Sequence, residues 1–537
     1  MASTPAGRDV SSIDGRASLW SPLRSPIFRR LLIADVVSDM GAFMQSVGAA
    51  WLMVSLGAGP TLVALTQTAS TLPFFLLALP AGAIGDIVDR RKLILYTEAW
   101  MVAVAVVLMV TTIAGVMSPW LLLALTFALS AGDAMETPTW RAVLPELVSK
   151  ADLPAASALN GIEFNFARAV GPALAGALIA TAGIGAAFAA NVVSFAGVII
   201  VVARWKRPVR RRSAAPETLG GATLAAIRYV RYSSSLGPVM LRAGVTMCTA
   251  SALLALLPTV ARGLSDSPTV YGVLLGCFGT GAIVGALTIQ PACGRWSLET
   301  VAGAAAVVLG VMIVVAGAVH SRIALGLTML IAGSGWIVFI SLVSALVQNL
   351  APDWARARIL SVFLLIFQGG MAAGSALWGA LAARVGIEMV FTVAGVSTVA
   401  TAALGFVARF PNVPIDLSPW NHWRMPAIRR DAAPSLEQGP VLVTVEYDVP
   451  SHDAERFLHA MERYGRVRRR DGASRWGIFR DLERADVFLE MFEVTSWAEH
   501  VRQHERFTRA DGALEQEIRR YVRNEPQIRH LIYAESD

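Results

Sequence analysis

The chain has 537 residues, of which 55% are hydrophobic and only 16% carry a charge, and its formal net charge is +7. Soluble domains carry about 25% charged residues, so this composition excludes a soluble globular protein of this length. Apolar stretches of roughly 20 residues, the length that crosses a ~30 Å hydrocarbon layer as a helix, recur along the chain. We therefore expect an all-α polytopic membrane protein.

The predicted elements begin after a polar segment, residues 1–27, which has no cleavable signal pattern and is expected to be a cytosolic tail. Lys and Arg gather in the loops that follow the even-numbered spans. This bias predicts a multi-pass inner (plasma) membrane protein with both termini in the cytosol, and it leaves no basic surface for nucleic acid. Twelve spans are predicted, at 28–56, 61–84, 93–115, 119–143, 157–181, 184–204, 239–261, 271–292, 301–319, 322–349, 357–383 and 387–409.

The spans divide into two halves that repeat each other. Residues 28–204 are expected to form an N-terminal six-helix bundle and residues 239–409 a C-terminal one, joined by a cytosolic linker with an interfacial helix at 205–238. Segment 144–178 aligns without gaps to 347–381, so that Gly171 and Gly176 fall on Gly374 and Gly379, and further on, at the same offset, Gly183 falls on Gly386. Parallel six-helix halves are an architecture of secondary transporters.

Beyond the spans, the character of the chain changes. Residues 410–439 form a Pro-rich linker, and residues 440–537 have a soluble composition. Strand-like alternation in VLVTVEYDV, helical spacing in DAERFLHAMERYGRV, a hairpin pattern, a second helical stretch and a last strand give the order β-α-β-β-α-β. We expect a small cytosolic α+β domain with a ferredoxin-like fold.

The stretch GAIGDIVDRRK between spans two and three interrupts the apolar sequence with a glycine, an aspartate four residues later and a basic pair: Gly82, Asp86, Arg90 and Arg91. With twelve spans in two halves, this stretch resembles the signature loop of the major facilitator superfamily. Ile87 and Asp89 depart from the family pattern, and the second half's QPACGRWSLET lacks the acid. The resemblance implies a cytoplasmic latch that holds the outward-facing state.

In span five, LNGIEFNFARAVGPALAG places small residues where helices pack closely: Gly171, Pro172 and Gly176. This Gly-Pro pair followed by Gly resembles the antiporter motif of exporters. Together with SDMGAFMQSVGAAWLMVSL, it makes residues 25–410 similar to the transmembrane secretion effector branch, which includes enterobactin-exporter-like and macrolide-efflux-like proteins. The resemblance implies export and leaves the substrate open.

Ionisable residues inside spans are functional candidates. Proton coupling needs a buried carboxyl group that takes up and releases a proton as its surroundings change. The candidates all lie in the N-terminal half: Asp39, Asp133, Glu136, Glu163 and Glu98. Arg168 is a candidate counter-ion for one of them or a receptor for an anionic substrate. Structural buried ion pairs are the alternative, and Asp35 reads as a helix-start residue.

The substrate is expected in a central cavity between the halves. Candidate lining residues are Gln45, Trp51, Trp336, Phe363 and Gln368. No GxxxxGK[ST] motif is present, so ATP is not expected to drive transport. The three cysteines read as small buried hydrophobic residues, and neither a metal site nor a cofactor is predicted.

The soluble segment resembles the dimeric α+β barrels of the antibiotic-biosynthesis-monooxygenase type, through VFLEMFEVTSWAEHVRQHERF. His500 and His504 lie four residues apart on one helix, but no third ligand accompanies them, so solvated histidines are favoured over a metal site. The resemblance implies a dimerisation module, with a substrate-sensing domain and an active monooxygenase as alternatives.

The sequence therefore predicts a secondary transporter that exports a small amphipathic molecule, such as a drug, siderophore or secondary metabolite, by alternating access. Its expected partners are that substrate, protons, the lipid bilayer and a second copy of the chain bound through the C-terminal domain. The alternatives are a membrane-anchored monooxygenase-like enzyme and a ligand sensor built on a transporter scaffold.

Overall fold

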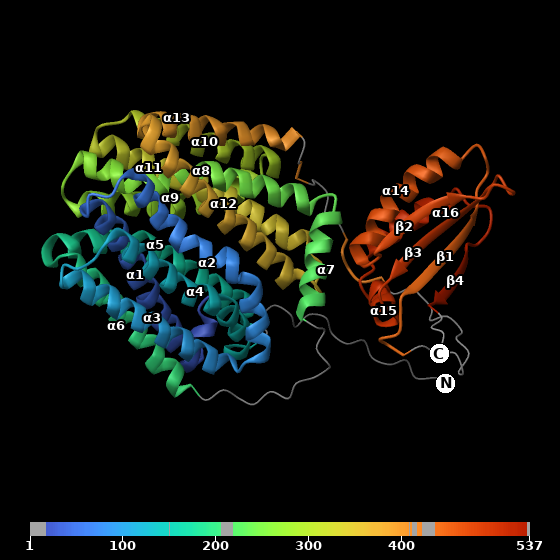
Figure 1. The fold of residues 1–537 in the computed structure, drawn as a ribbon, viewed down its shortest axis with the longest axis horizontal. Coiled ribbons are helices and arrows are strands. Elements are labelled where there is room, and N and C mark those ends of the chain that lie inside the picture. The colour runs from blue at the N-terminus through green and yellow to red at the C-terminus, as the bar shows by residue number, and fades with distance from the viewer. Residues whose placement is uncertain are drawn as a thin grey trace, which may run out of the picture.

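The computed structural model describes residues 18–149, 151–205, 219–406, 409–410, 416–420 and 435–533. Figure 1 shows two parts: a large helical bundle and, beside its helix α7, a small domain with a sheet. The bundle carries the candidate transport residues, so its geometry decides which of them meet.

Twelve long helices form the bundle. Eleven described helices are long and apolar enough to cross a membrane, and α4 is not among them because Asp133 and Glu136 interrupt its apolar sequence. The helices match the predicted spans closely. They are α1 (Pro26–Ser55), α2 (Pro60–Ile87), α3 (Arg90–Ile113), α4 (Pro119–Leu147), α5 (Leu153–Ala182), α6 (Ile184–Arg204), α8 (Leu236–Leu264), α9 (Pro268–Cys293), α10 (Leu298–Ala318), α11 (Arg322–Leu350), α12 (Arg356–Val385) and α13 (Ile387–Thr401).

The linker between the halves contains the expected additional helix, α7 (Leu219–Tyr232). It precedes α8 and lies at the end of the bundle that faces the C-terminal domain (Figure 1). We call this the domain-side end; α1, α3, α5, α8, α10 and α12 begin there. The opposite end is the distal end.

The internal repeat predicted from the sequence is present in three dimensions. Helices α5 and α6 have the bounds of α12 and α13 shifted by the same offset, apart from the shorter end of α13. The two turns between them place Gly183 at φ +84° and Gly386 at φ +85°, a left-handed conformation that glycine adopts without strain. Equivalent positions therefore have equivalent backbone geometry in the two halves.

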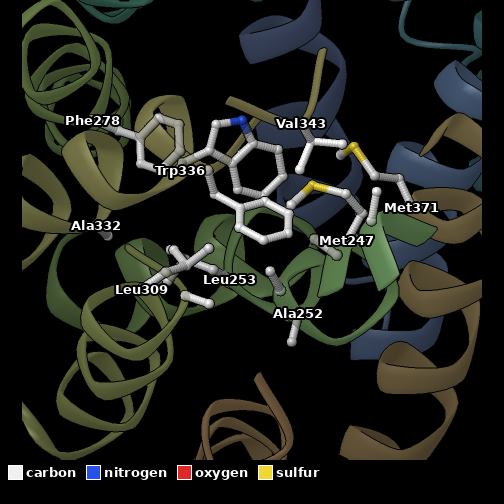
Figure 2. Packing of buried hydrophobic residues seen from close by; sticks show 14 of the residues in the cluster. Met247, Ala252, Leu253, Phe278, Leu309, Ala332, Trp336, Val343 and Met371 are labelled. Carbon is white, nitrogen blue, oxygen red and sulfur yellow. The ribbon is translucent and has the colours of Figure 1, made fainter. Parts of the chain in front are cut away.

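The C-terminal half has a dense aromatic core. Figure 2 shows Trp336 of α11 beside Phe278 of α9, among Met247, Leu309 and Met371. The rings of Trp336 and Phe278 meet edge to face with centroids 5.9 Å apart, a favoured geometry for aromatic pairs. This packing fixes α9 against α11 within the half.

The C-terminal domain has the expected ferredoxin-like order. Its sheet runs β2-β3-β1-β4 with antiparallel neighbours. Alternate residues of β1 and β3 are buried under the helices, as the two-residue period of a strand requires. The elements are β1 (Val441–Asp448), α14 (Ala454–Asp471), β2 (Arg475–Arg480), β3 (Val487–Val494), α15 (Trp497–Glu505), α16 (Arg509–Arg519) and β4 (Gln527–Ile532).

Candidate functional site

The acidic candidates of the N-terminal half form one cluster, although they come from four helices. Its members are Asp35 and Asp39 of α1, Glu98 of α3, Asp133 and Glu136 of α4 and Glu163 of α5, which we call the acid cluster. Glu98, Glu136 and Glu163 are buried, Asp35 and Asp39 are half-buried, and Asp133 is exposed. The members of the cluster therefore differ in how much of the side chain is enclosed by protein.

Two pairs of carboxyl groups within the cluster share hydrogen bonds. Glu163 pairs with Asp39 across α5 and α1, and Glu98 pairs with Glu136 across α3 and α4. An ionised carboxylate only accepts hydrogen bonds, so a pair of this kind requires a proton on one partner.

Neutral donors complete the surroundings of the cluster. Thr97 Oγ1 donates to Glu136 Oε2 at 2.6 Å, and Thr137 Oγ1 donates to Asp133 Oδ1 at 3.2 Å. Among the described residues, Glu98 Oε2 and Glu163 Oε1 are buried without a hydrogen-bond partner. Buried polar atoms of this kind are costly, and they are available to an incoming proton or ligand.

Asp35 belongs to this cluster and is not the helix-start residue that the sequence suggested. Helix α1 begins at Pro26, and Asp35 Oδ2 accepts a hydrogen bond from Trp140 Nε1 of α4 at 3.0 Å. The signal for its role was present in the sequence, because Asp35 and Asp39 lie four residues apart on one helical face.

The two halves meet through α2 with α12 and α5 with α9. Thr61 Oγ1 donates to the Gly379 carbonyl at 3.2 Å, and Thr269 Oγ1 donates to the Gly176 carbonyl at 3.4 Å. Both contacts lie near the distal end of the bundle. Gly176 and Gly379 are equivalent in the repeat, and a helix of the opposite half packs against each of them.

Gly171, Pro172 and Gly176 all lie at helix crossings. A Cβ on Gly171 would lie 2.9 Å from Phe43 Cβ of α1, and one on Gly176 would lie 3.0 Å from Thr269 Cα of α9. On the facing helix, a Cβ on Gly272 would approach the Pro172 carbonyl oxygen even more closely. Side chains at these positions would separate the helices.

Arg168 lies further along the same α5–α9 contact. Its guanidinium carbon is 5.9 Å from the centroid of the Phe278 ring, across the boundary between the halves. Within the described part of the chain Arg168 forms no ion pair with the acid cluster. The geometry thus gives no support to a counter-ion role, and the anion-binding alternative stays open.

The cavity candidates occupy different environments. Gln45 is 3% exposed and its Oε1 accepts a hydrogen bond from Asn191 of α6, so in this conformation it packs inside its own half. Trp336 is likewise buried in the core of Figure 2. Neither side chain is at the cavity-lining position that the sequence predicted. The Gln45 amide is hydrogen-bonded to a neighbouring helix, and the Trp336 ring is packed against neighbouring helices.

Of the other three cavity candidates, Trp51 lies at the boundary between the halves. Trp51 stacks on Tyr271 of α9 with ring centroids 6.3 Å apart, and Arg262 of α8 lies 5.7 Å from the Trp51 ring. Phe363 contacts Phe367 on α12, and Gln368 is half-buried one residue further. Trp51 therefore belongs to the contact that joins the halves at the distal end.

Two residues of the latch motif, Gly82 and Asp86, are outside the set whose surroundings the structure describes. Arg90 Nη1 donates to Glu146 Oε1 and to the Ala142 carbonyl of α4, both at 2.8 Å. Arg91 Nε donates to the Val202 carbonyl of α6 at 3.0 Å. The described basic residues of the motif therefore bind helix ends of their own half.

The C-terminal domain contacts the bundle through aromatic and charged side chains, which we call the docking seam. Glu499 of α15 accepts a hydrogen bond from Arg228 of α7 at 2.8 Å. Trp354, just before α12, lies edge to face with Tyr229 of α7, and Arg506 lies 4.9 Å from the Trp354 ring. Burial opposes ionisation of Glu499, but Arg506 and Arg228 hold its pKa below the ordinary value of 4.5. The seam is thus charged at neutral pH.

His500 and His504 are not the solvated pair that the sequence favoured. His500 is 1% exposed, and its ring centroid lies 4.9 Å from those of both His504 and His530 of β4. Burial and the neighbouring His530 lower the pKa of His500 to about 4. No group of three or more candidate ligands in the described residues is arranged to hold a metal ion.

Comparison with solved structures places this fold among membrane transporters. A bacterial homologue of the human lysosomal transporter Spinster, in an inward-facing and unoccupied conformation, matches with a TM-score of 0.56 at 14% identity, over 72% of this chain and 95% of that one. A bacterial homologue of the iron transporter ferroportin matches with a TM-score of 0.54 at 17% identity, over 71% and 97%. The fold is that of a major facilitator transporter.

Sequence comparison gives the family. The staphyloferrin A transporter of Staphylococcus aureus is 22% identical over 67% of this chain and 90% of its own length, and an uncharacterized MFS-type transporter of Sinorhizobium fredii is 24% identical over 69% and 92%. The family model for transmembrane secretion effectors matches residues 17–537. The chain therefore belongs to the transmembrane secretion effector family and is a transporter.

The buried histidines make the stability of the C-terminal domain depend on pH. An unfolded chain protonates histidine near pH 6.5, whereas the folded domain keeps His500 neutral down to about pH 4. Stability is therefore lost as the pH falls through this window, by on the order of 3 kcal/mol. Hydrogen exchange of the β4 amides, corrected for intrinsic rates, should report this loss. His500→Gln should flatten the dependence, and His459→Gln on the exposed face of α14 should leave it unchanged.

Proposed function

We propose that this protein is a proton-coupled exporter of a small amphipathic molecule in the inner membrane, with both termini in the cytosol. The single observation that carries the proposal is the acid cluster, whose paired carboxyl groups require bound protons in the middle of a membrane-spanning half. Acids inside a bilayer are costly, so a cluster of them needs a function. Proton transfer is the function that their chemistry suits best.

The relation between the halves supports alternating access. The described hydrogen bonds between them involve the distal parts of α2, α5, α9 and α12, whereas a Cβ on Gly161, nearer the domain-side end of α5, would meet no atom within 4 Å. This is the pattern expected of a transporter closed at its distal end. With the termini cytosolic, the state would be the inward-facing one, ready to receive a substrate from the cytosol.

The proton path proposed here begins at Asp133, the exposed member of the acid cluster. A proton taken up there would pass to the Glu98–Glu136 pair or the Asp39–Glu163 pair as the halves rock. Substrate and proton would then compete for binding to the inward-facing state. This competition would couple their movements in opposite directions. The latch would act in the opposite, outward-facing state.

Replacing an acid of the cluster by its amide should uncouple transport. Asp39→Asn, Asp133→Asn and Glu163→Gln keep the side-chain size but cannot release a proton, so substrate-dependent proton movement should fall to background. The measurement is proton release from energised everted vesicles, screened against antibiotics, dyes and siderophores. Glu388→Gln, which changes an exposed acid at the distal end, is the matched control. Normal proton movement in all three cluster variants would contradict the proposal.

The substrate class is proposed to include anions. Arg168 is a cation at the boundary between the halves, beside an aromatic ring and without an acidic partner among the described residues. A guanidinium next to an aromatic face suits a carboxylate attached to an apolar body. The relative that transports staphyloferrin A makes siderophores the first compounds to test.

Arg168→Gln should raise KM for anionic substrates roughly tenfold, because a hydrogen bond to a charged group contributes about 1.5–3 kcal/mol. Neutral substrates should keep their KM, and Arg168→Lys should retain part of the affinity. Uptake into everted vesicles measures both. Arg384→Gln, at an exposed position on α12, is the control. An equal loss for neutral and anionic compounds would instead indicate a packing role.

We further propose that the C-terminal domain pairs two copies of the chain. The face of its sheet opposite the helices carries Leu442, Leu489, Met491, Phe479 and Leu531, and the last two are 56% and 49% exposed. An open sheet face with these apolar side chains suits a partner sheet, and its charged residues Glu446, Glu493, Arg475 and Arg529 would lie at the same interface. The domain would then connect two independent transport units.

Mass measurement by light scattering in detergent tests this pairing. The full-length protein should be dimeric, and Phe479→Asp should make it monomeric because it places a charge on the paired face. Leu482→Asp changes a fully exposed leucine in the turn between β2 and β3 and should leave the dimer intact. A monomeric wild type would contradict the pairing.

A further inference from the structure

A second site lies outside the transport path, in the docking seam. A cavity of about 430 Å³ separates the C-terminal domain from the start of α12, and it is lined by Trp354 and Arg358 of the bundle and by Arg502, Glu505 and Arg506 of the domain. Pockets for drug-sized ligands range from about 300 to 1,000 Å³. The cavity beside Asp35 and Trp140 holds only about 10 Å³, enough for a water molecule.

The lining of the seam cavity is strongly basic. Three arginines and one glutamate, Glu505, line it, and Glu499 pairs with two of these arginines, Arg502 and Arg506. Arginine presents its N–H groups as a planar fork that matches the oxygen atoms of a carboxylate or a phosphate. The electrostatics of the cavity therefore favour an anion.

Two of these arginines are held in place by the seam itself. Arg506 Nη1 donates to Glu499 Oε1 at 2.8 Å and to the Asp471 carbonyl at 3.0 Å. Arg502 Nη1 donates to Glu499 Oε2 at 3.1 Å. Because these contacts fix the side chains before a ligand arrives, less conformational entropy is lost on binding.

Trp354 adds an apolar wall. Its indole ring lines the cavity, whereas its Nε1 is buried and is not reached from the cavity. The cavity thus combines cations and an aromatic surface.

We propose that the docking seam binds an organic anion, with its carboxylate or phosphate group held by Arg358 and Arg502 and its apolar part against Trp354. The ligand contacts both the bundle and the C-terminal domain, so binding stabilises their docked arrangement. Two kinds of molecule carry such an anionic group: a soluble organic anion and an anionic lipid with its headgroup.

The probe is 4-fluorobenzoate, followed by the broadening of its ¹⁹F signal with full-length protein in phosphatidylcholine nanodiscs. All proteins carry Arg168→Gln, so that an anion site between the halves does not contribute. Adding Arg358→Gln or Arg502→Gln should weaken binding roughly tenfold, and Trp354→Phe should weaken it less. Arg484→Gln, an exposed arginine between β2 and β3, is the matched control and should bind normally.

Loss of binding in both arginine variants, which change different parts of the molecule, would establish a site that spans the seam. Equal broadening in all variants would overturn the proposal. A failure of proton-coupled transport would leave this result unaffected, so the two proposals fail separately.

Nanodiscs that also contain phosphatidylglycerol identify the source of the anion. If the lipid reduces 4-fluorobenzoate binding to the control protein, and this reduction disappears in the Arg358→Gln variant, the occupant is a lipid headgroup. Equal binding in both kinds of nanodisc supports a soluble anion. No binding in either kind, with the control protein correctly folded, contradicts the site altogether.

Discussion

Six carboxyl groups inside one apolar half of the molecule are the constraint on which the rest of the structure depends. Charged groups are costly in hydrocarbon, and like charges close together raise the cost further. The N-terminal half meets this cost by pairing Asp39 with Glu163 and Glu98 with Glu136, and by supplying hydroxyl and indole donors from Thr97 and Trp140. The C-terminal half carries no such cluster among its described residues and is packed around aromatic side chains.

This division of chemistry contrasts with the symmetry of the backbone. Helix α9 of the other half packs against Gly176, and α2 packs against Gly379, the equivalent residue of the repeat. Gly171 and Gly374 lie against α1 and α8 in the same way. The two halves are thus joined through equivalent small residues, which allow close helix contact with little side-chain interlocking. Such contacts suit surfaces that separate and close again.

The C-terminal domain contacts the bundle through α7 and the start of α12. Tyr229 is buried at the seam between Trp354 and the guanidinium of Arg470, which lies 4.9 Å from its ring. Burial raises the pKa of Tyr229 to about 12. Since α7 connects the two halves in sequence, a domain fixed to it contacts the segment that must accommodate their relative movement. The open face of its sheet stays accessible to another chain.

The sequence by itself determined the twelve helices, their division into two halves, the repeat and the order of the small domain. Each of these follows from local patterns: apolar length, the equal spacing of glycines and the alternation of strands. Only the tertiary structure decided that Asp35 joins the acid cluster, that Arg168 faces Phe278 instead of an acid, and that Gln45 bonds to Asn191. It also brought His530 onto His500 and placed Trp354 beside α15. These relations depend on how helices rotate about their axes and how separate segments pack, which a helical period leaves undetermined.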